Sequence, residues 1–449
     1  MTRTYRFFLV SLFLFLITAQ ASAAAACTIT VTVSGDTYED QLPWNGCGLI
    51  NQSGLQNALN QQANNSSIRV KLKGAGRIIV PAGNALQVKS NTVLYSDGAA
   101  RETVVISPEF GALRTQGDNL IRIDNASDTA LWNLNVNGSD QNYNAIGPLI
   151  KVSNGTRTRI LANKITAHNS ALSIFQGSGV QIKFNSIENK FLPNSQVSFS
   201  TPGQAIWMNG TKSSEIDKNS FSQLTYYNLP TQPRVSPSDN TRQAPVDTIA
   251  VYSTDGLRIT RNFIKYAHTA GIYTACGVGG FPLECSSGDN KGLVIWDNRI
   301  KYTKQHGIDV VYAKNPRLIA NKVCSTGLSL INLAAVDGGL VRYNVAADGG
   351  LAPNATSREG DASLHLVWGT NDVSVLNNTF HNYHGGPAVS TLEPAPSNFP
   401  AATNNDLANN YFETGSGGLY ELLSDSDFTF TNNITTSYTP NTSHSFCNF

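Results

Sequence analysis

The stretch HGIDVVYAKNPRLIANKV (306–323) closes on a short alternating run followed by an asparagine, a polar residue and an apolar residue. Variants of this ending recur along the chain, with the asparagine at positions 163, 185, 219, 262, 298, 321, 344 and 378. The shortest spacings are 22 residues (163 to 185) and 23 residues (298 to 321), and longer spacings leave room for insertions. A repeat of this length predicts a solenoid, in which each unit buries its apolar face only against its neighbours.

Each repeat contains two or three short segments of alternating apolar and polar residues, bounded by Gly, Asn or Asp, and none has a helical period. This pattern predicts an all-β, single-stranded parallel β-helix with coils over about residues 68–435. The repeated asparagine suits a turn because it tolerates left-handed backbone and hydrogen-bonds the neighbouring coil. The segment SGLQNALNQQ (53–62) predicts a short N-terminal helix, begun by Ser53, that covers the first coil.

Composition places the chain among globular proteins. Its 449 residues are 41% apolar and 14% charged, which suits one large, turn-rich β domain. The formal net charge of +1 argues against nucleic acid as the main partner.

The first 26 residues have the pattern of a secretory signal peptide, with Arg3 and Arg6 before an apolar run that ends in ASA. We therefore expect residues 27–449 to be the exported domain, secreted or periplasmic, and no membrane span is predicted in it. Lipidation at Cys27 is a minor alternative.

Six cysteines in an exported chain predict disulfide bonds. Local pairs 27–47 and 276–285 are proposed, and the C-terminal residues are expected to fold back, tied by Cys447. No metal site is predicted, because no two cysteines have zinc-ligand spacing beside a histidine.

Residues 27–50 are interpreted as an irregular lead-in segment. Three insertions, at 224–247, 275–292 and 348–363, are expected to wall one face of the solenoid.

Counting back from the repeated asparagine aligns the coils. Thirteen residues before Asn321 lies Ile308, and the same count reaches Ile150, Ile206, Ile249 and Ile331. Ile272 and Leu364 take the equivalent place by local similarity. These aliphatic side chains are predicted to point into the core.

The next residue of each strand points outward, because side chains alternate along a strand. That outward column reads Lys151, Ser173, Trp207, Ala250, Tyr273, Asp309, Asn332 and His365. Neighbouring coils lie ~4.8 Å apart, so the last four form a polar column, with His306 and Asp247 alongside at strand starts. His306 and Asp309 flank Ile308 and are expected to face one solvent groove. Titratable groups gathered in a walled cleft indicate a functional site.

A polar outward column also suits a solenoid without an active site, because surface positions are polar in general. Trp207 either stacks on a sugar ring or is covered by the 224–247 insertion. Trp296 falls on a different strand and is interpreted as a packing residue.

The G-I-x-V and N-x-I segments resemble the right-handed parallel β-helix repeats of secreted carbohydrate-active enzymes: polysaccharide lyases, mannuronan C5-epimerases and several glycoside hydrolase families. The resemblance covers about residues 68–435 and implies that fold. The hydrolase motifs N-T-D, D-D and G-H-G and the epimerase motif D-P-H are not intact, so no family residue is transferred.

The first hypothesis for function is a lyase or epimerase that takes the C5 proton of a uronate in a polysaccharide. Asn332, with His365 or Lys304, would neutralise the sugar carboxylate. His306 or Tyr273 would be base and acid, and Asp309 would orient His306 and raise its basicity.

The alternative is a glycoside hydrolase or transglycosylase with Asp247 and Asp309 as paired carboxyls, and Asp337, Glu359 and Asp361 in reserve. A second alternative is a non-enzymatic carbohydrate-binding or adhesin solenoid. No cofactor is predicted; calcium is possible, but no aspartate-rich run marks a site.

Overall fold

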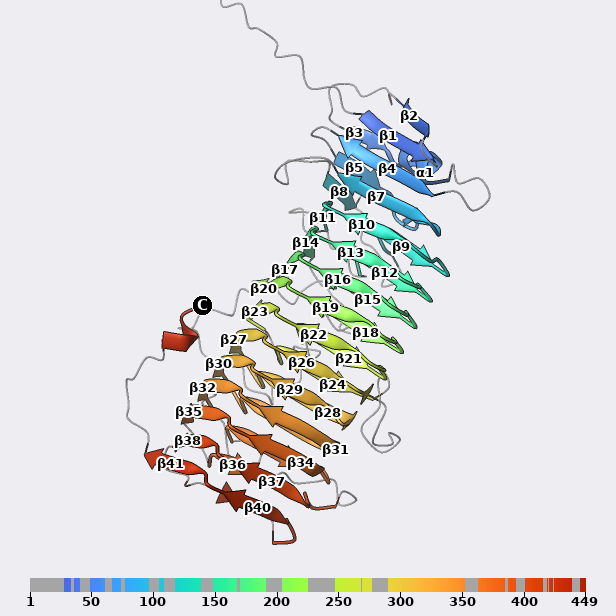
Figure 1. The fold of residues 1–449 in the computed structure, drawn as a ribbon. Coiled ribbons are helices and arrows are strands. Elements are labelled where there is room, and N and C mark those ends of the chain that lie inside the picture. Colours follow the sequence, from blue (N-terminus) through green and yellow to red (C-terminus); the bar gives the residue numbers. More distant parts are fainter. Residues whose placement is uncertain are drawn as a thin grey trace, which may run out of the picture.

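The computed structural model describes residues 28–33, 36–40, 49–60, 67–73, 77–96, 105–108, 118–138, 148–167, 170–190, 204–224, 247–267, 269–276, 290–351, 362–383, 387–392, 400–414, 418, 420–422, 424–437 and 445–449. Their strands wind into a right-handed parallel β-helix with three faces (Figure 1). The fold predicted from the sequence is confirmed.

Each full coil gives one strand to each face. Face 1 consists of β6 (Leu86–Gln87), β9 (Ile121–Asp124), β12 (Ile150–Ser153), β15 (Leu172–Phe175), β18 (Ile206–Asn209), β21 (Ile249–Tyr252), β24 (Ile272–Ala275), β28 (Ile308–Lys314), the start of β31 (Ile331–Arg342), β33 (Leu364–Val367), β36 (Val389–Ser390) and β39 (Tyr420–Glu421).

Face 2 consists of β4 (Ile68–Lys73), β7 (Thr92–Ser96), β10 (Ala130–Trp132), β13 (Arg159–Leu161), β16 (Gln181–Lys183), β19 (Glu215–Asp217), β22 (Arg258–Thr260), β26 (Val294–Trp296), β29 (Arg317–Ile319), the end of β31, β34 (Asn371–Leu376), β37 (Asn405–Ala408) and β40 (Phe428–Thr431). The short β25 (Asn290–Lys291) pairs with the end of β28.

Face 3 consists of β3 (Leu49–Asn51), β5 (Arg77–Val80), β8 (Val105–Pro108), β11 (Asn135–Asn137), β14 (Lys164–Ala167), β17 (Ser186–Lys190), β20 (Ser220–Leu224), β23 (Phe263–Lys265), β27 (Arg299–Thr303), β30 (Lys322–Thr326), β32 (Val345–Gly349), β35 (Thr379–Tyr383), β38 (Tyr411–Thr414) and β41 (Ile434–Ser437).

A helix and two antiparallel strands lie at the N-terminal end. Helix α1 (Gln52–Asn60) buries Leu55, Ala58 and Leu59 against the first coils, as predicted. Strand β1 (Thr28–Val33) pairs antiparallel with β2 (Asp36–Asp40) and with β4. The prediction of an irregular lead-in over 27–50 was therefore wrong for these strands, because β1 adds to the exposed edge of the first coil.

The core follows the register predicted from the asparagine count. Ile150, Leu172, Ile206, Ile249, Ile272, Ile308, Ile331 and Leu364 are paired in succession across face 1. All of them are fully buried. The predicted inward column is confirmed, which also fixes the outward column beside it.

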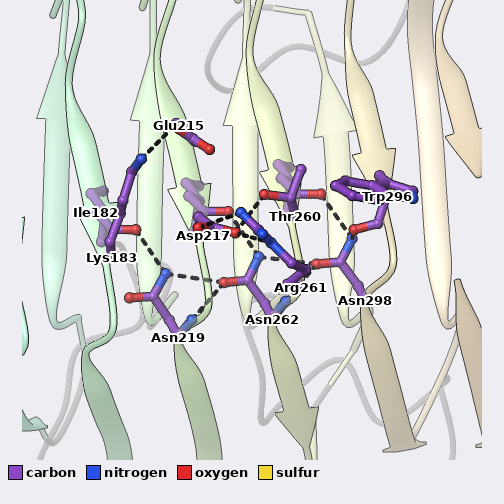
Figure 2. A network of polar contacts seen from close by, with 12 residues as sticks. Ile182, Lys183, Glu215, Asp217, Asn219, Thr260, Arg261, Asn262, Trp296 and Asn298 are labelled. Atoms are coloured by element: carbon purple, nitrogen blue, oxygen red, sulfur yellow. Dashed lines mark hydrogen bonds and ion pairs between the residues drawn. The ribbon is translucent and has the colours of Figure 1, made fainter.

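The repeated asparagines form a buried ladder between faces 2 and 3 (Figure 2). Asn262 is typical: its Oδ1 accepts hydrogen bonds from the backbone N–H and the Nδ2 of Asn219, and its Nδ2 donates to Ile216 O and Asn298 Oδ1. The predicted bonding to neighbouring coils is confirmed. The left-handed residue, however, is the one before the ladder, such as Arg261 with φ of 54°.

The C-terminal residues return to face 3, as predicted. Cys447 forms a disulfide with Cys324, and its carbonyl accepts a hydrogen bond of 2.6 Å from Lys301 Nζ. The ring of Phe449 packs edge-on against Phe263. Cys276 is also disulfide-bonded, but the predicted pairs 27–47 and 276–285 involve positions outside the described residues.

The signal peptide and most of each predicted insertion lie outside the described residues as well. Within the described ranges, no helix is long and apolar enough to cross a membrane.

Candidate active site

The predicted outward column exists on face 1. Tyr273, Asp309, Asn332 and His365 are register partners on the successive strands β24, β28, β31 and β33. Trp207 lies further along the same column, on β18.

Two of these side chains are more buried than predicted, whereas Trp207, Tyr273 and Asp309 are half-buried. His365 is 1% exposed and Asn332 is 7% exposed, whereas an open solvent groove was expected. A second apolar cluster outside the β-helix core explains part of this burial: it contains Cys276, Val311, Tyr312, Ala334, Ala335 and Val367, with Tyr273 and Trp368 packed against it. The column is therefore a largely dehydrated site, in which charges interact more strongly than at a surface.

Asp309 is held by Asn332, whose Nδ2 donates a hydrogen bond of 2.8 Å to Asp309 Oδ1. Burial raises the pKa of Asp309 to about 7, although this hydrogen bond opposes the rise. The prediction that Asp309 orients His306 was wrong, because Asp309 bonds across the coils to Asn332 rather than along its own strand. At neutral pH, Asp309 exists in both protonation states.

Asp247 is 4% exposed and lies just before β21. Its Oδ1 accepts hydrogen bonds of 2.6 Å from Thr269 Oγ1 and 3.0 Å from the Ala270 N–H. Burial raises the pKa of Asp247 to about 6, the two hydrogen bonds lower it, and the charge of Asp309 raises it. The two carboxyls therefore lie close enough to affect each other's ionisation.

The two histidines are neutral at physiological pH. Burial lowers the pKa of His306 to about 4 and, more strongly, that of His365 to about 3. Among the described residues, no group hydrogen-bonds the buried His306 Nδ1, His365 Nε2 or Asn332 Oδ1. Buried polar atoms without partners are rare in folded proteins, and each is available to a ligand.

A row of aromatic side chains leads toward the carboxyls. Trp207 lies 6.1 Å from Tyr252, and Tyr252 lies 6.1 Å from Tyr273, measured between ring centroids. Burial raises the pKa of Tyr273 well above its usual range, and the charges of Asp309 and Asp247 raise it further. Tyr252 was missed from the sequence, although its outward position, two residues after Ala250, could have identified it.

The other predicted residues lie outside this group. Lys304 precedes β28, and burial lowers the pKa of its amine to about 8. Asp337 forms an ion pair of 3.1 Å with Lys314, and Glu359 and Asp361 lie outside the described residues. Within the described ranges, no three His, Cys, Asp or Glu side chains form a metal-binding group. The absence of a cofactor, with calcium as the alternative, stays a prediction.

Comparison with known proteins identifies the fold. No family model and no curated protein sequence matches the chain. Among solved structures, the A-module of the mannuronan C-5 epimerase AlgE6 of Azotobacter vinelandii superposes with a TM-score of 0.53 at 11% identity, covering 86% of this chain and 95% of the module. The chain has the β-helix fold of that module.

A second A-module, from AlgE4 of the same organism, gives the same TM-score at 13% identity, covering 84% of this chain and 91% of the module. At such identities the likeness concerns the fold alone, so the chemistry has to be argued from the residues of this chain.

Proposed function

We propose that this protein is an exported enzyme that hydrolyses glycosidic bonds in a polysaccharide, with Asp309 as general acid and Asp247 as general base. One observation carries the proposal: the half-buried Asp309 and the buried Asp247, with pKa values of about 7 and about 6, lie beside three buried polar atoms that have no partner within the described residues. Acid–base catalysis is most efficient when the catalytic pKa lies near the working pH.

The environments of the two carboxyls set their roles. Asp247 accepts two hydrogen bonds, which favour its ionised form, so it is the group that takes a proton from water. Asp309 accepts one hydrogen bond and has the higher pKa, so it keeps the proton that the leaving oxygen needs. Pairs of acids whose environments separate their pKa values are typical of this division of labour.

The register weighs against a retaining mechanism. Asp309 is paired with Tyr273, which is paired with Ala250 on the strand that Asp247 precedes. Two strand steps of ~4.8 Å separate the coils of the carboxyls by roughly 10 Å. This rise is about twice the ~5–5.5 Å that retention needs and slightly exceeds the ~6.5–9.5 Å typical of inversion, so inversion requires the two side chains to lean toward each other.

The neighbouring groups would hold the sugar. Asn332 Oδ1 would accept a hydrogen bond from a sugar hydroxyl, and each neutral histidine would accept or donate a hydrogen bond through its unpartnered nitrogen. Trp207 and Tyr252 offer ring faces for stacking next to the carboxyls.

Elimination or epimerisation, the first hypothesis from the sequence, is the second candidate. Tyr273 is placed to donate a hydrogen bond to a leaving oxygen beside Asp309, but its raised pKa makes its phenol a weak proton donor. The neutral state of both histidines weighs against it, because neither supplies the positive charge that a uronate carboxylate needs.

The pH profile is a direct prediction. We expect kcat/KM to rise as Asp247 loses its proton near pH 6 and to fall as Asp309 loses its proton near pH 7, giving a bell with its maximum between these values. The profile is measured on any polymer that the protein cleaves. If kcat/KM keeps rising above pH 8, Asp309 is not the general acid.

The decisive experiment is a screen of the purified protein on neutral glucans, fructans, alginate, pectate and glycosaminoglycans. Reducing ends and the ultraviolet absorbance of unsaturated sugars are read together. Reducing ends without that absorbance support hydrolysis, and reducing ends with it establish elimination. Proton NMR of the recovered polymer detects epimerisation, which releases no ends.

A further inference from the structure

A row of exposed aromatic rings follows the edge between faces 2 and 3, away from the candidate active site. Trp132 and Trp296 end strands β10 and β26, and Phe184 and Tyr343 directly follow β16 and β31. Their exposed fractions are 43%, 37%, 54% and 50%, in that order. They are four of the seven large hydrophobic side chains exposed among the described residues. Single exposed hydrophobics are ordinary, but a row of them on one edge indicates an interaction surface.

The rings are spaced along the axis of the β-helix. Strand pairing places Phe184 two coils beyond Trp132, Trp296 three coils further, and Tyr343 two coils after that. At ~4.8 Å per coil the row is about 34 Å long. One coil rises by about the length of one pyranose unit in an extended polysaccharide. Successive sugar units of such a chain can therefore lie at equivalent places on successive coils.

A basic group lies beside each of three rings. Lys218 Nζ lies 5.2 Å from the centre of Phe184, and Arg342 Cζ lies 4.3 Å from that of Tyr343. Arg261 Cζ lies 5.7 Å from Trp296 and is fixed by two hydrogen bonds to the buried Asp217 (Figure 2). Trp296 was interpreted from the sequence as a packing residue, yet it is partly exposed with its ring beside this arginine.

Two of the rings occupy strained backbone. Phe184 and Tyr343 have φ values of 59° and 57°. The equivalent position is also left-handed in the other coils, where it holds Asn133, Ala162, Lys218, Arg261, Asp297, Ala320, Asn377, Asn409 and Asn432. Asparagine tolerates this left-handed conformation, and a bulky aromatic residue there is unusual. The left-handed conformation is therefore a property of the turn, and what distinguishes these two coils is that the turn carries an exposed aromatic ring.

The charge of this edge differs from that of the whole chain. The face 2 strands from β10 to the end of β31 (340–342), each taken with the residue that follows it, carry seven basic and three acidic side chains: Arg159, Lys183, Lys218, Arg258, Arg261, Arg317 and Arg342 against Glu215, Asp217 and Asp297. The whole chain has a net charge of only +1. Asp217 and Glu215 form ion pairs with Arg261 and Lys183, so the surplus positive charge of this edge is carried by the remaining basic side chains.

We infer that this edge, from Trp132 to Tyr343, is a binding track for an extended acidic polysaccharide. Ring faces stack on the apolar faces of sugar units, and the adjacent ammonium and guanidinium groups pair with carboxylate or sulfate substituents. The track is separate from the face 1 column, so binding there does not depend on the proposed hydrolysis.

The test compares two double variants in an Asp309→Asn background, which keeps any bound polymer uncut. Phe184→Ala with Trp296→Ala removes the centre of the track. Tyr420→Ala with Ile434→Ala removes two other exposed hydrophobics, 38% and 59% exposed, from the C-terminal coils. Affinity is measured by isothermal titration calorimetry with alginate, polygalacturonate, dextran sulfate, neutral dextran and an oligothymidylate.

We expect at least one acidic polymer to bind, with a tenfold or greater loss in the track variant and less than a twofold change in the control. Binding should weaken as salt rises, and neutral dextran should not bind. Equal affinities in the two variants, or no binding by any acidic polysaccharide, would overturn the inference. Tighter binding of the oligothymidylate, lost in the track variant, would assign the edge to nucleic acid instead.

Discussion

Asp309→Asn is expected to lower kcat by about 10³-fold, within the range that general acid catalysis contributes. The new amide still accepts the hydrogen bond of Asn332 through its oxygen, so the column should keep its shape. The amide of the variant, however, has no acidic proton to give to the leaving oxygen. KM should change little, and the fall in rate on the alkaline side should disappear from the pH profile.

Asp337→Asn is the matched control. Asp337 lies on the next strand of the same sheet, but it pairs with Lys314 and is half-exposed outside the column. Initial rates of reducing-end release should stay within twofold of the parent protein. If Asp337→Asn abolishes the activity while Asp309→Asn leaves it intact, the catalytic acid lies elsewhere.

The fold could be predicted from the sequence because a solenoid repeats its local rules. The asparagine recurs where each coil turns, and counting from it places Ile308 and its equivalents in the core with no long-range information. The N-terminal strands escaped this procedure, because β1 belongs to no repeat and pairs antiparallel with β4.

The site was only half predictable, for a physical reason. Strand alternation determines which side of the sheet Asp309 faces, so the column could be read from the sequence. Alternation says nothing about what covers that side, and burial decides the ionisation of the column. Burial makes His306 neutral and raises the pKa of Asp309 to about 7, and these two shifts are why we propose hydrolysis rather than elimination. The exposed track was missed because no repeat rule distinguishes Phe184 from an ordinary turn residue.

Asn262→Ala should have the largest effect on stability. The change removes an acceptor used by the Asn219 backbone N–H and by Asn219 Nδ2, and a donor used by Ile216 O. These groups are buried and would be left without hydrogen-bond partners, and each unpaired group costs roughly 1–3 kcal/mol of stability. We expect the free energy of unfolding, measured in urea, to fall by at least about 3 kcal/mol. Backbone strain does not contribute, because the left-handed residue is Arg261 rather than Asn262.

The location of the damage is the sharper part of this prediction. Each coil of a solenoid contacts only its neighbours, so a broken ladder should open the coils on either side before distant ones. Hydrogen exchange should therefore accelerate most in β19, β22 and β26 and least in β37 and β40. Gln181→Ala, an outward, half-buried position on β16, serves as the control and should leave exchange unchanged. Uniform acceleration along the whole chain would mean that the β-helix unfolds as one unit, and an unchanged urea midpoint would mean that the asparagine ladder contributes nothing to its stability.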